Sequence, residues 1–207
     1  MSRTKIKFCG ITRLEDMQFA SKLGVDALGF VFCPQSPRAV DVQQACTLSE
    51  QCLPFITRVG LFMNQDSRTI HQVLQEVALD VLQFHGDESE DFCASFGFPY
   101  IKSIAMGGED NNVSSSNYTS ATALLLDSNE VGQAGGSGKV FDWNRVPELD
   151  KPIILAGGLE ADNVQSAIRE VHPYAVDVSS GIEETKGIKS QQKMKEFVNA
   201  VRAADEC

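Results

Sequence analysis

The chain has 207 residues, of which 43% are hydrophobic and 22% are charged, and its formal net charge at pH 7 is −10. This length favours a single domain over residues 1–207, and the composition is typical of a globular protein. Because so acidic a surface repels nucleic acid and anionic lipids, we expect neither a nucleic-acid nor a membrane partner. The sequence has no bilayer-length apolar run and no signal peptide, which indicates a cytoplasmic protein.

Short apolar segments alternate with segments of helical spacing along the chain. The apolar segments are rich in Val, Ile, Leu and Phe without clean alternation, which is typical of strands buried on both faces of a parallel sheet. The predicted strands are Lys5–Cys9, Ala27–Phe32, Thr57–Phe62, Val81–His85, Tyr100–Ile104, Ala123–Asp127, Ile153–Ala156 and Ala175–Val178. Eight such units predict an α/β fold that closes into a single-domain (β/α)8 barrel. An open doubly wound sheet is the alternative, but no glycine-rich dinucleotide fingerprint follows the first strand.

Helical spacing predicts helices between most of these strands. Leu14–Leu23 follows Thr12 and Ser67–Ala78 follows Asp66, and both preceding residues are of the type that caps helices. Further helices are predicted over Glu88–Phe96, Ala161–Val171 and Gln191–Ala203. The Ser- and Asn-rich stretch Met106–Ser120 is predicted to lack a stable helix. The glycine-rich stretch Ser128–Val140 follows a strand and is a candidate lid over the site.

The last two predicted strands are each followed directly by small residues. Ile153–Ala156 runs into Gly157-Gly158-Leu159, and Ala175–Val178 runs into Ser179-Ser180-Gly181. Small residues let backbone N–H groups close on an anion, and a following helix start adds its positive dipole end. Because the last two strands of a barrel are neighbours, these turns predict one phosphate site at its C-terminal face. The protein is therefore expected to bind a phosphorylated small molecule.

Metal and cofactor motifs are not found in the sequence. No CxxC pair occurs, and the three histidines do not cluster with the cysteines, so we expect no metal and no cofactor. Most of the cysteines are expected to be free thiols in a reducing compartment. The six cysteines are Cys9, Cys33, Cys46, Cys52, Cys93 and Cys207.

Cys9 and Asp127 end the first and sixth predicted strands and are candidates for acid–base chemistry. A thiol has an ordinary pKa near ~8.5, so Cys9 needs an activating environment to act as a base or nucleophile. The alternative is a small buried residue that only fills space. Partial burial at the barrel mouth can raise the pKa of Asp127 and suit it for general acid work. Its alternative is a cap of the following turn.

Three further residues are expected at the same mouth. The Arg38 guanidinium can hold a carboxylate bidentately, although an arginine in a surface ion pair is the commoner case. His85 can act as an acid, a base or a hydrogen-bond donor, or bond only the backbone at its strand end. Asp177 can bind a ribose hydroxyl or hold the phosphate turn.

Six stretches of the chain match one family in order. The sequence resembles the phosphoribosylanthranilate isomerases, whose first-strand signature is usually K-I-C-G-I-T. The matching stretches are Lys7–Thr12, Gly29–Phe32 through Ser36–Arg38, Arg58–Phe62, Leu82–Gly86, Leu124–Asp127 with Gly135–Trp143, and Ala156–Leu159 with Asn163-Val164 and Val176–Glu183. One departure is Lys186–Ser190, which stands where the family usually has P-G-x-K-D, although Ser190 can still cap the last helix.

The resemblance implies an isomerase of tryptophan biosynthesis that needs neither metal nor cofactor. The implied reaction is the Amadori rearrangement of N-(5-phosphoribosyl)anthranilate to 1-(2-carboxyphenylamino)-1-deoxyribulose 5-phosphate. It implies Asp127 as the general acid, Cys9 as the general base and Arg38 at the anthranilate carboxylate. The turns with Gly157-Gly158 and Ser180-Gly181 match the phosphate-binding turns. Cys9 must then start ionised and Asp127 protonated.

Other interpretations stay open from the sequence. The histidine-pathway sugar isomerase is expected to use two aspartates, and indole-glycerol-phosphate synthase a lysine and a glutamate at strand ends. A non-catalytic phosphoribosyl-binding barrel is a third possibility, which intact Cys9 and Asp127 disfavour. The chain is expected to act as a monomer or a homodimer.

Overall fold

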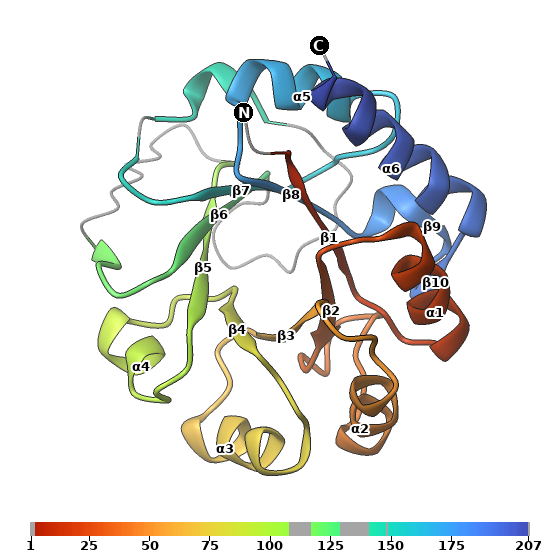
Figure 1. Ribbon diagram of the computed structural model, residues 1–207. Helices are drawn as coiled ribbons and strands as arrows, with labels where there is room; N and C mark the ends of the chain where they lie inside the picture. The colour runs from red at the N-terminus through yellow and green to blue at the C-terminus, as the bar shows by residue number, and fades with distance from the viewer. Residues whose placement is uncertain (1–2, 108–116, 129–140, 148, 207) are drawn as a thin grey trace.

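The computed structural model describes residues 3–107, 117–128, 141–147 and 149–206, and it confirms the predicted barrel (Figure 1). Neighbouring strands pair in parallel in chain order, and β8 returns to β1 to close the ring. Each strand lies within one residue of its predicted bounds. The strands are β1 Lys5–Cys9, β2 Ala27–Val31, β3 Thr57–Phe62, β4 Val81–Phe84, β5 Tyr100–Ala105, β6 Ala123–Asp127, β7 Ile153–Leu155 and β8 Ala175–Val178.

Helices surround the barrel. Asp66 and Ser190 cap α3 and α6 as predicted, because their side chains accept from the backbone N–H of Thr69 and Lys193. Thr12 does not cap α1, since its hydroxyl donates to the carbonyl of Gly187 in a loop near the C-terminus. The helices are α1 Leu14–Leu23, α2 Val42–Glu50, α3 Ser67–Glu76, α4 Glu90–Ala94, α5 Val164–Val171 and α6 Gln191–Asp205.

The ends of α3 and α6 lie two residues from their predicted positions, and three other helices differ in their start or were not predicted. The sequence analysis missed α2, in which polar residues dominate and only Ala45, Leu48 and Ser49 are buried. The predicted start of α4 at Glu88 was wrong, because Ser89 caps the helix and the Glu88 carboxylate accepts from two loop N–H groups. Similarly, α5 begins later than predicted, because Asn163 holds the preceding residues in a turn.

Side-chain alternation along β1 decides which residues face the barrel interior. Phe8 is fully buried against Phe197 of α6, outside the sheet. Lys7 and Cys9 therefore point inward, because successive strand residues face opposite sides. The floor of the interior is apolar and formed by Ile101, Ala123, Leu125, Ile154, Ala156 and Ala175.

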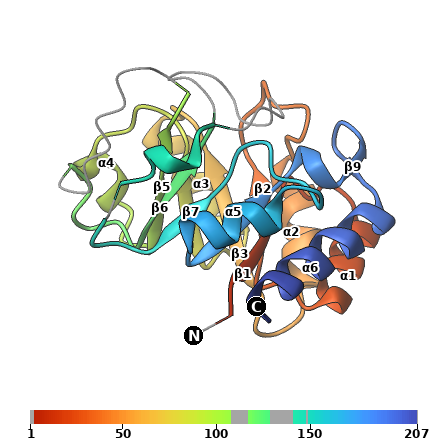
Figure 2. The ribbon, with the colours of Figure 1, turned by 90° about the horizontal axis from the view of Figure 1, so that it is seen from above.

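The chain does not pass directly from β8 into a long helix. A 3-10 turn, η3 Ser180–Ile182, follows, and then an antiparallel hairpin of β9 Glu183–Thr185 and β10 Ile188–Lys189. The start of β1 and the end of α6 lie close together (Figure 2), and the Asp205 carboxylate accepts from the Thr4 backbone N–H there. Among the described residues no helix is long and apolar enough to span a membrane. The candidate lid and the predicted helix-free stretch fall largely on residues 129–140 and 108–116, outside the described residues.

Candidate active site

One pocket at the C-terminal mouth of the barrel collects the residues that the sequence singled out. It contains about 590 Å³ of space open to solvent. Cys9, Arg38, His85, Asp127 and Asp177 all line it, although they come from five different strand–helix units. The sequence therefore predicted that these five side chains lie together, because parallel strands bring their C-terminal ends to one rim. The remaining lining residues are Val31, Cys33, Ser36, Pro37, Leu61, Met63, Gln83 and Ser179.

The Cys9 thiol is buried at the end of β1. Burial raises the pKa of this thiol, and the Lys7 ammonium opposes that effect. A Cβ atom on Gly29 of β2 would lie 2.9 Å from Cys9 Sγ and 3.3 Å from Lys7 Nζ, so glycine is what makes room for both groups. Burial therefore opposes the ionised form of Cys9 that the resemblance implies, and the Lys7 ammonium favours that form.

Lys7 forms a buried ion pair with Asp177 across the β1–β8 seam. Lys7 Nζ lies 2.8 Å from Asp177 Oδ1, and both side chains are less than a tenth exposed. Burial lowers the pKa of Lys7, but the charges of Asp177 and Cys9 outweigh it and raise the pKa above its ordinary value. Asp177 therefore holds a cation beside Cys9, a partner that the sequence analysis did not foresee.

His85 and Asp127 face each other across the pocket. His85 Nε2 lies 3.6 Å from Asp127 Oδ2, and both side chains are nearly buried. Burial, together with the cations Lys102 and Lys7, lowers the pKa of His85 to about 4. The imidazole is therefore neutral at physiological pH, which makes it a hydrogen-bonding group rather than a charged acid.

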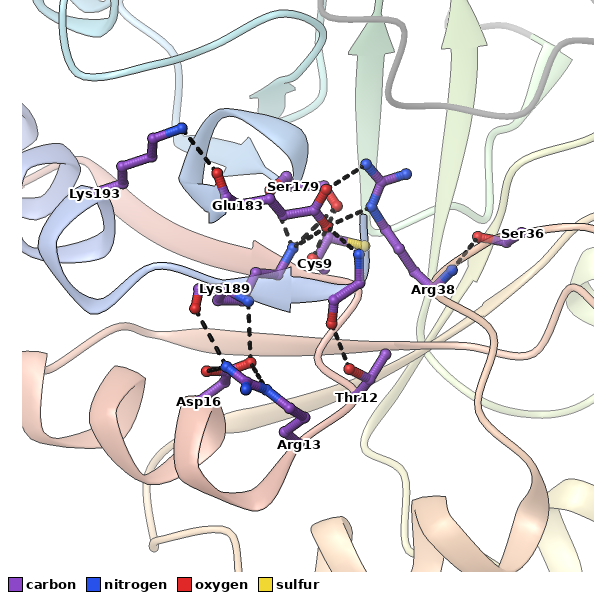
Figure 3. Close-up of polar contacts among 11 residues, drawn as sticks. Cys9, Thr12, Arg13, Asp16, Ser36, Arg38, Ser179, Glu183, Lys189 and Lys193 are labelled. Atoms are coloured by element: carbon purple, nitrogen blue, oxygen red, sulfur yellow. Dashed lines mark hydrogen bonds and ion pairs between the residues drawn. The ribbon is translucent and has the colours of Figure 1, made fainter. Parts of the chain in front are cut away.

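Arg38 lies in a buried network with the hairpin that follows β8 (Figure 3). Its Nε and Nη2 donate to the two carboxylate oxygens of Glu183 at 2.7 and 2.8 Å. Lys189 Nζ also contacts Glu183 Oε1, at 3.0 Å. Burial raises the pKa of Glu183, but the Arg38 hydrogen bonds and the Lys189 charge outweigh it and leave the pKa lowered. The alternative of a surface ion pair is thus wrong, because Arg38 is buried, and two of its nitrogens already hold a carboxylate of the protein.

The two small-residue turns meet as predicted. Gly157, Gly158 and Ser180 line a second pocket of about 310 Å³, which shares Asp127, Asp177 and Ser179 with the first. Gly157 and Gly158 have φ values of 86° and 63°, a region that favours glycine. Gly181 supports the junction by packing, since a Cβ atom there would lie 2.0 Å from the carbonyl oxygen of Leu159. The turns therefore form one continuous surface with the first pocket.

Lys102 and Glu88, which the sequence analysis missed, hold the backbone near the ends of β4 and β5. Lys102 is buried on β5 and donates to the backbone carbonyls of Phe84, Gly86 and Ser103. It also lies 3.5 Å from the Glu88 carboxylate. The sequence offered one signal for Lys102 and Lys7, because each lysine stands inside an apolar strand. Lysines are almost never buried unless they are paired, so such a position indicates a buried partner. Within the described ranges, no three His, Cys, Asp or Glu side chains are placed to hold a metal ion.

Comparison with known proteins identifies close relatives. Residues 6–200 match the family model described as N-(5'-phosphoribosyl)anthranilate isomerase. The enzymes of that name from Nitrosococcus oceani and Pseudomonas putida strain GB-1 are 50% and 49% identical, over 96% and 99% of this chain and 98% and 100% of their own lengths. The crystal structure of phosphoribosyl anthranilate isomerase from Thermotoga maritima covers 97% of this chain and 99% of its own, with TM-score 0.86 and 36% identity.

A further solved structure of an isomerase with that name carries a ligand. It is described as a complex with reduced 1-(o-carboxyphenylamino)-1-deoxyribulose 5-phosphate. It is 34% identical to this chain with a TM-score of 0.83, and it covers 97% of this chain and 99% of its own. Another is described as monomers of the dimeric Thermotoga maritima enzyme, with the same identity, TM-score and coverage.

Proposed function

Because the chain belongs to the N-(5'-phosphoribosyl)anthranilate isomerase family, we infer that it catalyses that isomerisation in tryptophan biosynthesis. The reaction is an Amadori rearrangement, which converts the aminoaldose N-(5-phosphoribosyl)anthranilate to the aminoketose 1-(2-carboxyphenylamino)-1-deoxyribulose 5-phosphate. The observation that carries the assignment is the single pocket lined by Cys9, His85 and Asp127 and continuous with the glycine turns. Such a pocket offers an acid, a base and an anion site to one phosphorylated sugar.

We assign the general acid to Asp127 and the general base to Cys9. Asp127 protonates the furanose ring oxygen, so that the C1–O bond breaks and a Schiff base with the anilino nitrogen forms. Cys9 then removes the C2 proton, and the resulting enolamine tautomerises to the ketose. One acid and one base placed within reach of the substrate suffice for this chemistry. Burial raises the pKa of Cys9, and the Lys7 ammonium is the nearby charge that favours the thiolate.

The two ends of the substrate take different anion sites. Backbone N–H groups of the turns at Gly157, Gly158 and Ser180 bind the phosphate, with Gly181 packed behind them. Glu183 engages two nitrogens of Arg38, and we assign the anthranilate carboxylate to Nη1, the third nitrogen. Asp177 holds Lys7 in place and remains a candidate for a ribose hydroxyl.

The remaining expectations follow from this assignment. The enzyme works on a small phosphorylated molecule as a single domain of residues 1–207, in the cytoplasm, without a cofactor or metal. It does so as a monomer or a homodimer and with no nucleic-acid partner.

The decisive test is turnover of phosphoribosylanthranilate, generated in situ from anthranilate and phosphoribosyl pyrophosphate by its transferase. Loss of substrate fluorescence should be fast with the parent protein and slower by about 10²-fold or more with Cys9→Ser and with Asp127→Asn. A well-folded parent that binds inorganic phosphate but turns over no substrate would support a non-catalytic phosphoribosyl-binding barrel instead. Turnover of the histidine-pathway aminoaldose alone would assign the related sugar isomerase.

A further inference from the structure

Gln83 is a buried polar side chain for which the proposed chemistry has no role. It lies on β4, two residues before His85, and its exposed fraction is zero. Both residues line the active-site pocket. The Gln83 side-chain nitrogen Nε2 lies 3.4 Å from His85 Nδ1, within hydrogen-bond range. Within the described residues the Gln83 oxygen Oε1 has no hydrogen-bond partner, so the amide nitrogen at His85 makes the polar contact of this side chain.

This contact determines where the single proton of the neutral imidazole lies. An amide nitrogen only donates hydrogen bonds, so His85 Nδ1 must accept and cannot carry a proton. A neutral imidazole keeps one N–H, which is then on Nε2. The neutral state itself follows from burial beside two cations, which lowers the pKa of His85 to about 4.

The N–H on Nε2 faces the proposed acid. His85 Nε2 lies 3.6 Å from Asp127 Oδ2, just beyond hydrogen-bond range. Contacts of this kind are often long in the absence of substrate and shorten in the complex. A protonated carboxyl has one O–H and one carbonyl oxygen, and only the carbonyl oxygen accepts readily. An N–H at Oδ2 therefore places the acid proton of Asp127 on Oδ1.

We propose that Gln83 is a positioning residue that sets the tautomer of His85, and through it the proton-carrying oxygen of Asp127. The inference rests on the proposed function, because it assigns Asp127 as the acid. When the Oδ1–H bond breaks and its proton passes to the ring oxygen of the substrate, Asp127 becomes a carboxylate. The His85 Nε2–H stabilises that carboxylate more than the neutral acid, so it favours proton transfer.

The tautomer can be measured without substrate. The chain has three histidines, and His71 and His172 are exposed. A background with His71→Gln and His172→Asn leaves His85 as the single histidine, and asparagine suits the left-handed backbone at position 172. The ¹⁵N NMR spectrum of this protein at pH 7 should show the Nε2-protonated, neutral imidazole. A spectrum of the Nδ1-protonated tautomer or of imidazolium overturns the proposal.

A matched pair of variants tests the role of Gln83. Gln83→Met keeps the side-chain length but removes the donor, so His85 should become a mixture of tautomers and kcat should fall about tenfold. KM should change less than twofold, because Gln83 is not assigned to either anion site. The control Leu82→Met changes the neighbouring residue on β4, which faces the outer apolar layer, and should leave tautomer and kcat as in the parent.

The proposal stands only if tautomer and kcat change together. A Gln83→Met protein that keeps the parent tautomer overturns it, whether or not kcat falls. A variant that loses the tautomer preference but keeps the parent kcat also overturns it. If the parent itself has no isomerase activity, the proposed function fails, and the NMR result still reports separately on the Gln83–His85 contact.

Discussion

Lys7 offers the sharpest test of how a buried thiol can serve as a base. Its ammonium and the Cys9 sulfur flank Gly29, and their separation cannot exceed the sum of 2.9 and 3.3 Å. Unit charges about 6 Å apart interact by about 3 kcal/mol at an effective dielectric constant of about 20. That energy corresponds to about a hundredfold change in the thiolate-to-thiol ratio at a pH below the pKa. Replacing Lys7 with methionine removes this stabilisation and leaves the Asp177 charge behind.

We therefore expect Lys7→Met to lower kcat/KM at pH 7 by about a hundredfold. The acid limb of the kcat/KM–pH profile should move to higher pH, because losing a nearby cation raises the pKa of Cys9. The control Lys7→Arg keeps the charge and should keep the position of the limb. The double variant Lys7→Met with Asp177→Asn removes both charges and should lose less activity than Lys7→Met alone.

A pH profile that stays in place in a folded Lys7→Met protein refutes the reasoning. Circular dichroism and thermal unfolding of all three variants establish that folded proteins are compared. If Lys7→Met is unfolded, the double variant carries the test, because it leaves no unpaired buried carboxylate.

Three further predictions concern other parts of the site. Because burial lowers the pKa of His85 to about 4, unfolding takes up a proton between that pH and 6.5. The free energy of unfolding, measured by denaturant titration, should therefore fall by up to about 3 kcal/mol as the pH drops through this window. The fall should be smaller in His85→Gln, which lacks the imidazole. Gly181→Ala places a Cβ atom 2.0 Å from a backbone oxygen, so it should lower the free energy of unfolding by about 1–3 kcal/mol and raise KM. The control Gly97→Ala also lies at a positive φ, of 67°, but in open space, and it should leave KM unchanged. Glu183→Gln removes the charged partner of Arg38 and should raise KM about tenfold with a smaller change in kcat; an unchanged KM contradicts the assignment of Arg38.

The barrel was predictable because its signal is local and repeated. Every strand is a short apolar run, and parallel strands must place their C-terminal ends at one rim. Cys9 and Asp127 could be assigned to that rim from position alone, since each is the last residue of its strand. The meeting of the two small-residue turns was predictable for the same reason, because Gly157 and Ser180 follow consecutive strands. Local pattern and sheet topology thus locate the mouth of the site.

The electrostatic partners were not predictable from such patterns. Lys7 and Asp177 pair across 170 positions of sequence, and Arg38 and Glu183 across 145. Neither pair has a spacing that a sequence reveals, because each depends on how the ring closes and on where the hairpin after β8 folds back. The protonation state of Cys9 depends on these same partners, so the expectation of an ionised thiol could not be checked from the sequence.

The buried cations around the mouth are paired with carboxylates, so their charges alone do not account for the binding of a substrate with two anionic groups. In the part of the chain that the structure describes, each buried ammonium or guanidinium around the mouth lies beside a carboxylate of the protein. The buried groups are Lys7 with Asp177, Arg38 and Lys189 with Glu183, and Lys102 with Glu88. In the proposed function, attraction of the substrate then comes from directed groups, namely backbone N–H groups at the turns and the third nitrogen of Arg38. Directed donors recognise the positions of a phosphate and a carboxylate, whereas unpaired lysines would attract any anion.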